Sequence, residues 1–480
     1  SGMVQINTRG MWVGTFHGLC HRLLRAHYRE ANLPQAFQIL DSSDQLGLIK
    51  RLLKQLNVDD EKYPAKALQS FINGQKEQGI RAADSSAWDD FSQKLIELYV
   101  CYEQQCQREG VVDFAELLLR SVELLQRNES LRQHYQQRFG YVLVDEFQDT
   151  NRLQYQWLKL LSGQNTAVFA VGDDDQSIYA FRGANVGNMR DFEREFKVSH
   201  LIRLEQNYRS QGHILTAANA LIAHNPERLG KNLWTDAGQG ERLRVFVATQ
   251  DSEEAGYIVD EVKHLHREGM ALDDMAVLYR SNAQSRIIEH ALFNAAIPYR
   301  VYGGLRFFER QEIKHALAYL RLVANPDDDG AFLRVVNVPA RGIGARSLEA
   351  IQAQAQQTGY SLWQAACSGA IKGKTASQLA IFVQMIEGLR QQLDHLSLLE
   401  VTEEVLVRSG LRAMYEQDKD GQDRLENLDE LLNAVKTFTY NPDEMPLDES
   451  DADASIVQSQ LQSFLAHATL EAGERQAGEG

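Results

Sequence analysis

Two adjacent carboxylates, Asp145 and Glu146, directly follow a short apolar run at residues 141–144. In an open α/β sheet, ligands bind beyond the carboxyl ends of the strands, and the apolar run predicts such a strand end here. One carboxylate can hold Mg²⁺ while the other orients and deprotonates a water molecule, which is the chemistry that phosphoryl transfer needs. Taken alone, an acidic pair of this kind is more often a solvated strand end.

A second segment favours the catalytic interpretation over the solvated one. Another apolar run, residues 167–171, ends in the stretch Gly172-Asp173-Asp174-Asp175. A helical pattern at residues 153–161 joins the two runs, so we expect two parallel strands that are buried on both faces. The two acidic segments would then follow neighbouring strands of one sheet.

The rest of the chain supplies the elements that must position these residues. Residues 19–126 show helical periodicity, as in Gln45–Leu56 and Phe91–Cys101, and no strand-like alternation. Beyond Ala324 the pattern is helical again, interrupted by an acidic stretch at Asn441–Asp453 that is typical of a solvated loop. Between these parts we expect a second α/β unit, with strands at 243–248, 276–279 and 299–302 and helices at 253–266 and 285–295.

Composition limits the class of protein. With 480 residues, 44% of them hydrophobic and 24% charged, the chain should form several globular domains. No apolar run approaches the roughly 18 residues that cross a bilayer, so we expect a soluble, intracellular protein with no membrane partner. The formal net charge of −16 argues against a surface coated with cations, so any DNA contact must be local. The four cysteines form no CxxC pair and support neither a zinc site nor a disulfide framework: Cys20, Cys101, Cys106 and Cys367.

In their order and spacing, the motifs resemble those of UvrD-type superfamily 1 DNA helicases, the family of UvrD, PcrA and Rep. The acidic segments at 145–151 and 172–184 are similar to its motifs II and III, and Leu204–Ser210 is similar to motif IV. The resemblance covers nearly the whole chain. Further segments that match the family are Thr15–Gly18 (motif Ib), Val112–Phe114 (ahead of the Walker B strand), Tyr279–Arg286 (the motif IVa region) and Tyr302–Lys314.

The resemblance implies a site for ATP and Mg²⁺. Asp145 would hold the Mg²⁺ ion, and Glu146 would act as the general base. Gln176 and Arg209 would reach the γ-phosphate, and Tyr208 would stack on the adenine. An arginine placed against the transferring phosphoryl group can contribute roughly 10³–10⁵ in rate. Without this context, a surface salt bridge would explain Arg209 about as well.

The resemblance also implies a path for single-stranded DNA. Tyr179 and Phe181 would flank this path with Arg182 beside them, and Thr15 and His17 would contact the strand as well. An aromatic face stacks on any base, at about 1–3 kcal/mol per base, which is comparable with the roughly 1.4 kcal/mol of a DNA base-pair step. Phe181 stands where the family usually has Trp, and a core role for Phe181 and a structural role for His17 stay open.

Two glycine-containing segments are weaker signals. Gly342-Ile343-Gly344 resembles the GIG loop of the family's mobile helical domain, whose glycines let backbone N–H groups approach duplex phosphates. A plain helix–helix turn is the alternative. Gly369–Thr375 imitates a P-loop, but it is one residue short of G-x-x-x-x-G-K-[ST] and no strand is predicted before it, so we expect no nucleotide there.

We therefore expect an α/β chain of two RecA-like P-loop NTPase halves, with parallel sheets and large helical insertion domains. Residues 1–110 would be a helical insertion in the first half and 111–203 its Walker B side, while 204–305 would begin the second half and 306–480 would form a mobile, mostly helical domain. The resemblance implies an ATP-dependent 3′–5′ translocase and helicase of the bacterial cytoplasm and nucleoid. It would act in repair and replication on single-stranded DNA and single-strand/duplex junctions, with mismatch- and excision-repair proteins as partners.

Two parts of the family's motif series have no counterpart in the chain. The Walker A loop with its lysine is not found between Ser1 and Trp12, and motifs V and VI are not found before Gly480. We therefore expect a fragment that does not hydrolyse ATP, and an inert DNA-binding or interaction fragment is the alternative from a different class. The motor part of a RecB- or AddA-type helicase–nuclease is disfavoured, because no nuclease-like extension is visible and the motifs match the UvrD-like series.

Overall fold

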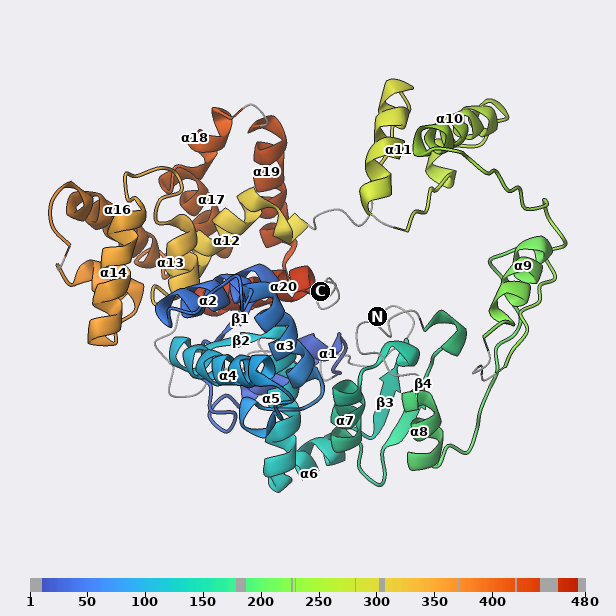
Figure 1. Cartoon of the computed structure of the whole chain (residues 1–480), viewed down its shortest axis with the longest axis horizontal. Coiled ribbons are helices and arrows are strands. Elements are labelled where there is room, and N and C mark those ends of the chain that lie inside the picture. The colour runs from blue at the N-terminus through green and yellow to red at the C-terminus, as the bar shows by residue number, and fades with distance from the viewer. Residues whose placement is uncertain are drawn as a thin grey trace. The chain divides into compact units, whose positions relative to one another are not determined.

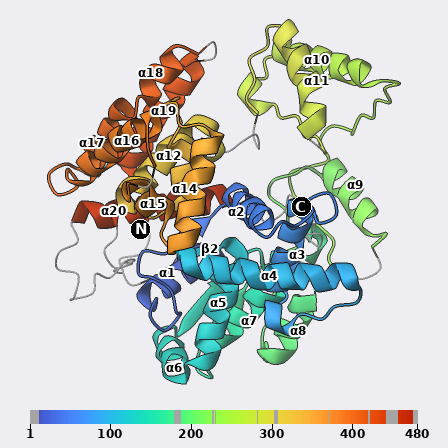
Figure 2. The same ribbon diagram turned by 60° about the vertical axis from the view of Figure 1, so that its left-hand side comes forward.

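The chain folds into two compact units. The first comprises Ser1–Val198 and Phe307–Gly480, and the second comprises Ser199–Arg306 (Figures 1 and 2). None of the described helices is long and apolar enough to cross a membrane. The finer division into four parts stays a prediction. This computed structural model describes residues 11–177, 187–225, 228, 230–280, 282–301, 307–369, 371–418, 421–440 and 456–473.

The amino-terminal part of the first unit is helical, as the periodicity predicts. The side chains of Asp41 and Asp89 cap the first turns of α2 (Ser42–Gln55) and α4 (Asp90–Glu109), which confirms the helices expected in both places. Two short strands were missed, because three residues are too few to show a period of two. The other elements of this part are α1 (Phe16–Ala26), the parallel strands β1 (Gln38–Leu40) and β2 (Val111–Asp113), α3 (Ala65–Glu77), the 3₁₀ turn η2 (Ala82–Asp84), α5 (Phe114–Arg127) and α6 (Glu129–Arg138).

A buried ionic network ties α3, α4 and α5 together. Lys76 is only 2% exposed, and its Nζ lies 2.6 Å from Asp113 Oδ2 and 2.9 Å from Glu116 Oε2. Tyr102 donates a hydrogen bond to Asp113 Oδ2 (2.7 Å), while Asp113 Oδ1 caps α5 by accepting from the backbone N–H of Glu116 (2.8 Å). Burial alone would lower the pKa of Lys76, but the charges of Asp113 and Glu116 raise it above its usual value. Lys76 therefore stays charged in the folded protein.

The strand–helix–strand unit predicted around the acidic residues is present. It consists of β3 (Tyr141–Val144), α7 (Arg152–Leu161) and β4 (Ala167–Ala170), followed by α8 (Gly187–Glu195). The strands are parallel, and Val144 pairs with Ala170, so both strands end at the same edge. The prediction that both faces are buried is wrong for the described residues: Val144 joins the core with α5 and α7, whereas Tyr141, Leu143 and Phe169 are exposed on the other face.

The carboxyl-terminal part of the first unit is helical, as predicted beyond Ala324. Its helices lie together (Figure 2). They share one hydrophobic core, in which Tyr319, Phe332 and Phe382 are fully buried. The acidic stretch Asn441–Asp453 lies outside the described residues. The elements are the 3₁₀ turn η7 (Phe307–Glu309), α12 (Gln311–Ala324), α13 (Asp329–Val335), α14 (Ala345–Thr358), α15 (Leu362–Cys367), α16 (Lys374–Arg390), α17 (Leu398–Arg408), α18 (Leu411–Glu416), α19 (Gly421–Thr437) and α20 (Ile456–Gly473).

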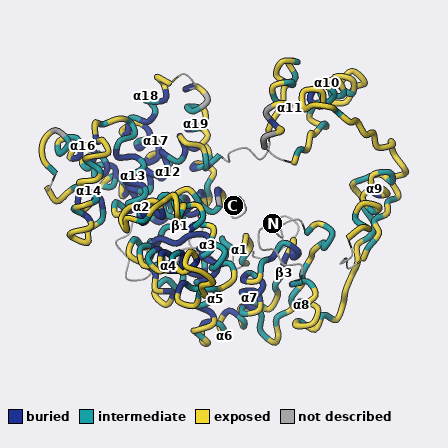
Figure 3. The backbone as a smooth tube through the Cα atoms, viewed as in Figure 1, coloured by how far each residue is buried: buried dark blue, intermediate teal, exposed yellow. Residues whose placement is uncertain are grey.

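The second unit has the predicted helices but not the predicted strands. Residues 243–248 and 276–279 are not strands, and among the described residues of this unit the strand-like pairing is a single bridge between Gln206 and Trp234. A strand requires a hydrogen-bonded neighbour, and these segments are exposed, with Leu278 95% accessible (Figure 3). The elements of this unit are α9 (Gly212–Ile222), α10 (Asp251–Arg267), the 3₁₀ turn η6 (Leu272–Asp274) and α11 (Asn282–Asn294).

Candidate functional site

The ends of β3 and β4 bring two acidic segments to one edge of the sheet. The backbone pairing continues past both strands, because Val171 N donates to Val144 O (2.8 Å) and Phe147 N donates to Val171 O (2.9 Å). Asp145 and Glu146 occupy the sharp turn between these bonds, with Glu146 in the left-handed region at φ 50° and both residues exposed. The strand end predicted for these two carboxylates is confirmed.

Gln148, for which the sequence pattern predicted no separate role, links the two acidic segments. Its fully buried amide donates through Nε2 to Glu146 Oε2 (2.7 Å) and accepts through Oε1 from the backbone N–H of Asp173 (2.9 Å). Gly172 permits this approach, since a Cβ at that position would lie 2.9 Å from Gln148 Oε1. The available signal was an amide three positions after Asp145 in the acidic motif. Gln148 therefore orients the carboxylate of Glu146 against the loop that follows β4.

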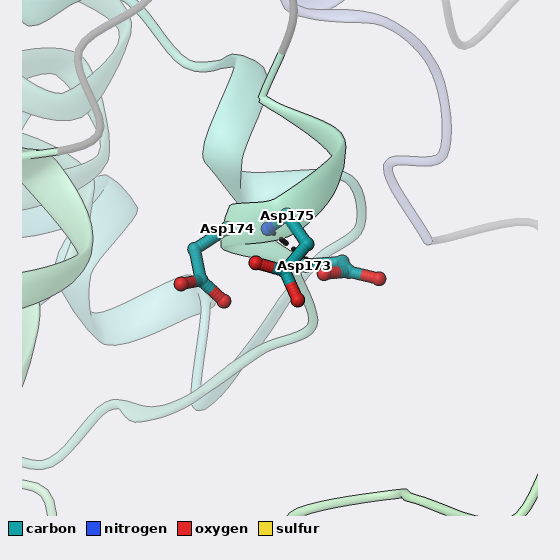
Figure 4. Close-up of side chains that lie close together, drawn as sticks. All are labelled: Asp173, Asp174 and Asp175. Atoms are coloured by element: carbon teal, nitrogen blue, oxygen red, sulfur yellow. Dashed lines mark hydrogen bonds between the residues drawn. The ribbon is translucent and has the colours of Figure 1, made fainter. Parts of the chain in front are cut away.

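The loop after β4 carries three half-buried aspartates that lie close together (Figure 4). Asp173, Asp174 and Asp175 each offer a carboxylate oxygen within 4.8 Å of the others. Asp173 accepts hydrogen bonds from the backbone N–H of Asp175 (3.0 Å) and from the Gln176 side-chain amide (2.7 Å), which belongs to the 3₁₀ turn η4 (Asp174–Gln176). Oxygen donors of this kind suit Mg²⁺. The structure thus brings Asp145, Glu146 and Gln176 to one edge of the sheet.

Tyr208 and Arg209 belong to the second unit. The Asn207 side chain accepts from the backbone N–H groups of Arg209 (2.9 Å) and Ser210 (2.7 Å), so a local turn sets this segment. The Tyr208 ring is 85% exposed and its hydroxyl donates to the Gln206 side chain (2.8 Å). An exposed ring can stack on a base, and an exposed guanidinium can meet a phosphate.

Of the residues predicted to contact single-stranded DNA, the structure describes Thr15 and His17. Thr15 is the N-cap of α1 and accepts from the backbone N–H of Gly18 (3.3 Å), while the His17 ring packs edge-on against Phe114 with centroids 5.6 Å apart. Both side chains therefore have structural partners at the start of α1. The other three residues predicted to contact the strand lie outside the described residues: Tyr179, Phe181 and Arg182.

The Gly342-Ile343-Gly344 loop precedes α14. Gly342 has φ +76°, and a Cβ added to Gly342 or Gly344 would meet no atom within 4 Å. Ile343 is fully buried in the core of the carboxyl-terminal helices, so the loop is exposed at Gly342 and Gly344 and not at Ile343. In the P-loop-like segment Gly369–Thr375, α16 begins at Lys374, and the element before the segment is the helix α15 and not a strand, as predicted.

Comparison with known families identifies the family of this chain. Residues 3–197 match the family model of the UvrD/REP helicase N-terminal domain, and residues 202–479 match that of the UvrD-like helicase C-terminal domain. The chain therefore belongs to the UvrD-like helicase family, as its motifs predict.

Individual relatives agree with this assignment. DNA helicase II of Escherichia coli (strain K12) is 50% identical over 475 residues, which cover 98% of this chain and 64% of the relative. DNA helicase II of Haemophilus influenzae is 47% identical over 98% of this chain and 64% of its own length. The ATP-dependent DNA helicase PcrA of Bacillus subtilis is 39% identical over 91% of this chain and 60% of its own length. The chain thus spans less than two thirds of these relatives.

Proposed function

We propose that these residues form the body of an ATP-driven motor that moves 3′ to 5′ along single-stranded DNA and separates duplexes in repair and replication. The observation that carries the proposal is the sheet edge at which Gln148 joins Glu146 to the loop after β4. Relatives named DNA helicase II and PcrA support it. The fold would be two RecA-like halves with helical insertions, divided at about residues 110, 203 and 305, and its setting would be the bacterial cytoplasm and nucleoid, beside mismatch- and excision-repair proteins.

The proposed nucleotide is ATP with Mg²⁺. The exposed carboxylate of Asp145 would hold the Mg²⁺ ion, whose charge would offset that of the phosphates. Glu146, oriented by Gln148, would accept a proton from the attacking water. Gln176 and Arg209 would reach the γ-phosphate, and the exposed ring of Tyr208 would stack on adenine.

The proposed DNA path would use two kinds of contact. Tyr179, Phe181 and Arg182, with Thr15 and His17, would grip the single strand by stacking and charge. At a single-strand/duplex junction, the backbone N–H groups of Gly342 and Gly344 would approach duplex phosphates, because no protein atom crowds either glycine.

Direction of movement provides the direct test of this function. A longer polypeptide that joins these residues to a phosphate-binding loop is expected to unwind a duplex with a 3′ single-stranded tail and to leave one with a 5′ tail paired, because the motor tracks one strand in one orientation. Strand separation is followed by gel electrophoresis on the two tailed duplexes. Equal unwinding of both duplexes would contradict the proposed polarity.

A valine at Gly344 tests the duplex contact. An added Cβ at this position meets no protein atom within 4 Å, so Gly344→Val should leave the fold intact and obstruct an approaching phosphate. We expect duplex affinity to fall about tenfold to a hundredfold, the usual value of one or two hydrogen bonds to a charged group. Binding of oligothymidylate should be unchanged, as measured by fluorescence anisotropy.

The matched control for this variant is Gly74→Val in α3, where an added Cβ likewise meets no neighbouring atom. This control should bind both ligands normally. If Gly344→Val weakens single-strand and duplex binding to the same extent, the loop is a structural turn and not a duplex contact.

A further inference from the structure

Arg341, the residue before the Gly342–Gly344 loop, turns its guanidinium into the protein. Nη1 donates to the carbonyl oxygens of Val335 (3.1 Å) and Pro339 (3.2 Å). Nη2 donates to the Tyr319 hydroxyl (2.6 Å) and to the carbonyl oxygen of Ser409 (2.8 Å). One side chain therefore joins the segment before the loop to α12 and to the residue that follows α17.

The partners of Arg341 are themselves held in place. Burial raises the pKa of Tyr319 to about 12, so its hydroxyl keeps its proton and donates to the carbonyl oxygen of Val338 (2.5 Å) while it accepts from Arg341. The guanidinium also lies over the Phe382 ring of α16, 5.2 Å from its centroid. Three helices of the group, α12, α16 and α17, thus meet at this one cation.

A second anchor fixes the loop itself. Asn337 Oδ1 accepts hydrogen bonds from the backbone N–H groups of Arg341 (2.7 Å) and Ile343 (3.2 Å). Together with the fully buried Ile343 side chain, these bonds leave Gly342 and Gly344 at the surface with open space around them. A loop ordered before binding avoids the entropy cost of ordering it on the ligand.

We propose that Arg341 is a positioning residue, which holds the Gly342–Gly344 loop in the shape that meets duplex phosphates and does not contact DNA itself. This inference rests on the proposed duplex contact of the loop. A lysine at position 341 could not make all of these contacts, because its compact ammonium lacks the planar fork of a guanidinium. In Arg341, Nη1 reaches the carbonyl oxygen of Val335, while Nη2 reaches the Tyr319 hydroxyl and the carbonyl oxygen of Ser409. Arg346 is exposed in the first turn of α14, so its side chain can meet a phosphate directly. It therefore serves as the control residue for Arg341.

The test compares Arg341→Gln, Arg341→Lys and Arg346→Gln in the full chain. The ligands are a hairpin duplex with a 3′ oligothymidylate tail and oligothymidylate alone, each titrated at several salt concentrations. We expect Arg341→Gln to weaken tailed-hairpin binding about tenfold, since ordering one backbone residue on binding costs roughly a decade in affinity. The slope of log K against log salt should not change, and oligothymidylate binding should stay normal. Arg346→Gln should instead reduce the magnitude of that slope by about 0.9, the value for one lost phosphate contact.

Amide hydrogen exchange supplies a readout that needs no DNA. In Arg341→Gln, exchange at residues 342–346 should become faster while the buried amides of α12 keep their protection, and Arg341→Lys should lie between this variant and the unchanged chain. Unchanged exchange in the loop, equal loss of protection in α12, or a salt slope lowered by Arg341→Gln would each overturn the inference. If Arg341→Gln speeds exchange in the loop but neither Gly344→Val nor Arg346→Gln weakens hairpin binding, the positioning role of Arg341 stands and the proposed duplex contact fails.

Discussion

A polypeptide of these 480 residues, given ATP, Mg²⁺ and single-stranded DNA, is expected to release phosphate no faster than its own Glu146→Gln variant. No segment of the 480 residues contains the pattern G-x-x-x-x-G-K-[ST]. The nearest imitation, Gly369–Thr375, is one residue short and follows a helix, not a strand. We therefore expect this polypeptide to lack the nest of backbone N–H groups and the lysine that cradle the β- and γ-phosphates.

The expected loss is close to total because of how phosphoryl transfer is catalysed. The enzyme does little covalent chemistry, and almost all of the acceleration comes from positioning and electrostatic stabilisation. Asp145, Glu146 and Gln176 lie at one edge of the sheet, but they cannot hold the triphosphate in line by themselves. A general base beside an unplaced substrate contributes nothing measurable.

Phosphate release is the measurement, and a longer polypeptide that includes a phosphate-binding loop is the positive control. That polypeptide should hydrolyse ATP in the presence of DNA, and Glu146→Gln should abolish the reaction. Release by the 480-residue polypeptide well above its Glu146→Gln blank would falsify the prediction. If Lys374→Ala then removed the activity, the segment Gly369–Thr375 would have replaced the missing loop.

Lys76→Met is expected to lower the free energy of unfolding of the α3–α5 region by about 3–5 kcal/mol, the usual result of removing one partner from a buried ion pair. Methionine has a similar volume, so the change removes the charge and leaves little cavity. Asp113 then stays buried with its hydrogen bonds from Tyr102 and the Glu116 backbone but without a cation, and Glu116 keeps only its arginine partners. The loss comes mainly from the uncompensated charge of Asp113.

Hydrogen exchange of buried amides in α5 measures this loss, because a chain of two units need not unfold in one step. The matched control is Lys94→Met in α4, whose Nζ lies 2.9 Å from Glu97 but whose side chain is 39% exposed. A solvent-exposed pair contributes at most about 1 kcal/mol, so the control should change little. A loss of similar size in both variants would show that water screens the Lys76 network.

The sequence by itself determined the elements whose cause is local. Short apolar runs predicted β3 and β4, helical periodicity predicted α2, α4 and α7, and the order of these elements placed Asp145 and Glu146 at a strand end. These features depend on neighbours within a few positions of the chain, so periodicity and spacing are enough to find them. The motif series extended the same reasoning to the family.

Tertiary structure decided what depends on distant partners. Gln148 meets Asp173 across 25 positions, Lys76 meets Asp113 across 37, and Arg341 meets the Ser409 carbonyl across 68. No period in the sequence encodes such pairs, because burial and the meeting of separate elements create them. The same dependence explains residues 243–248, which have the composition of a strand but, in the described part of the second unit, no strand to pair with.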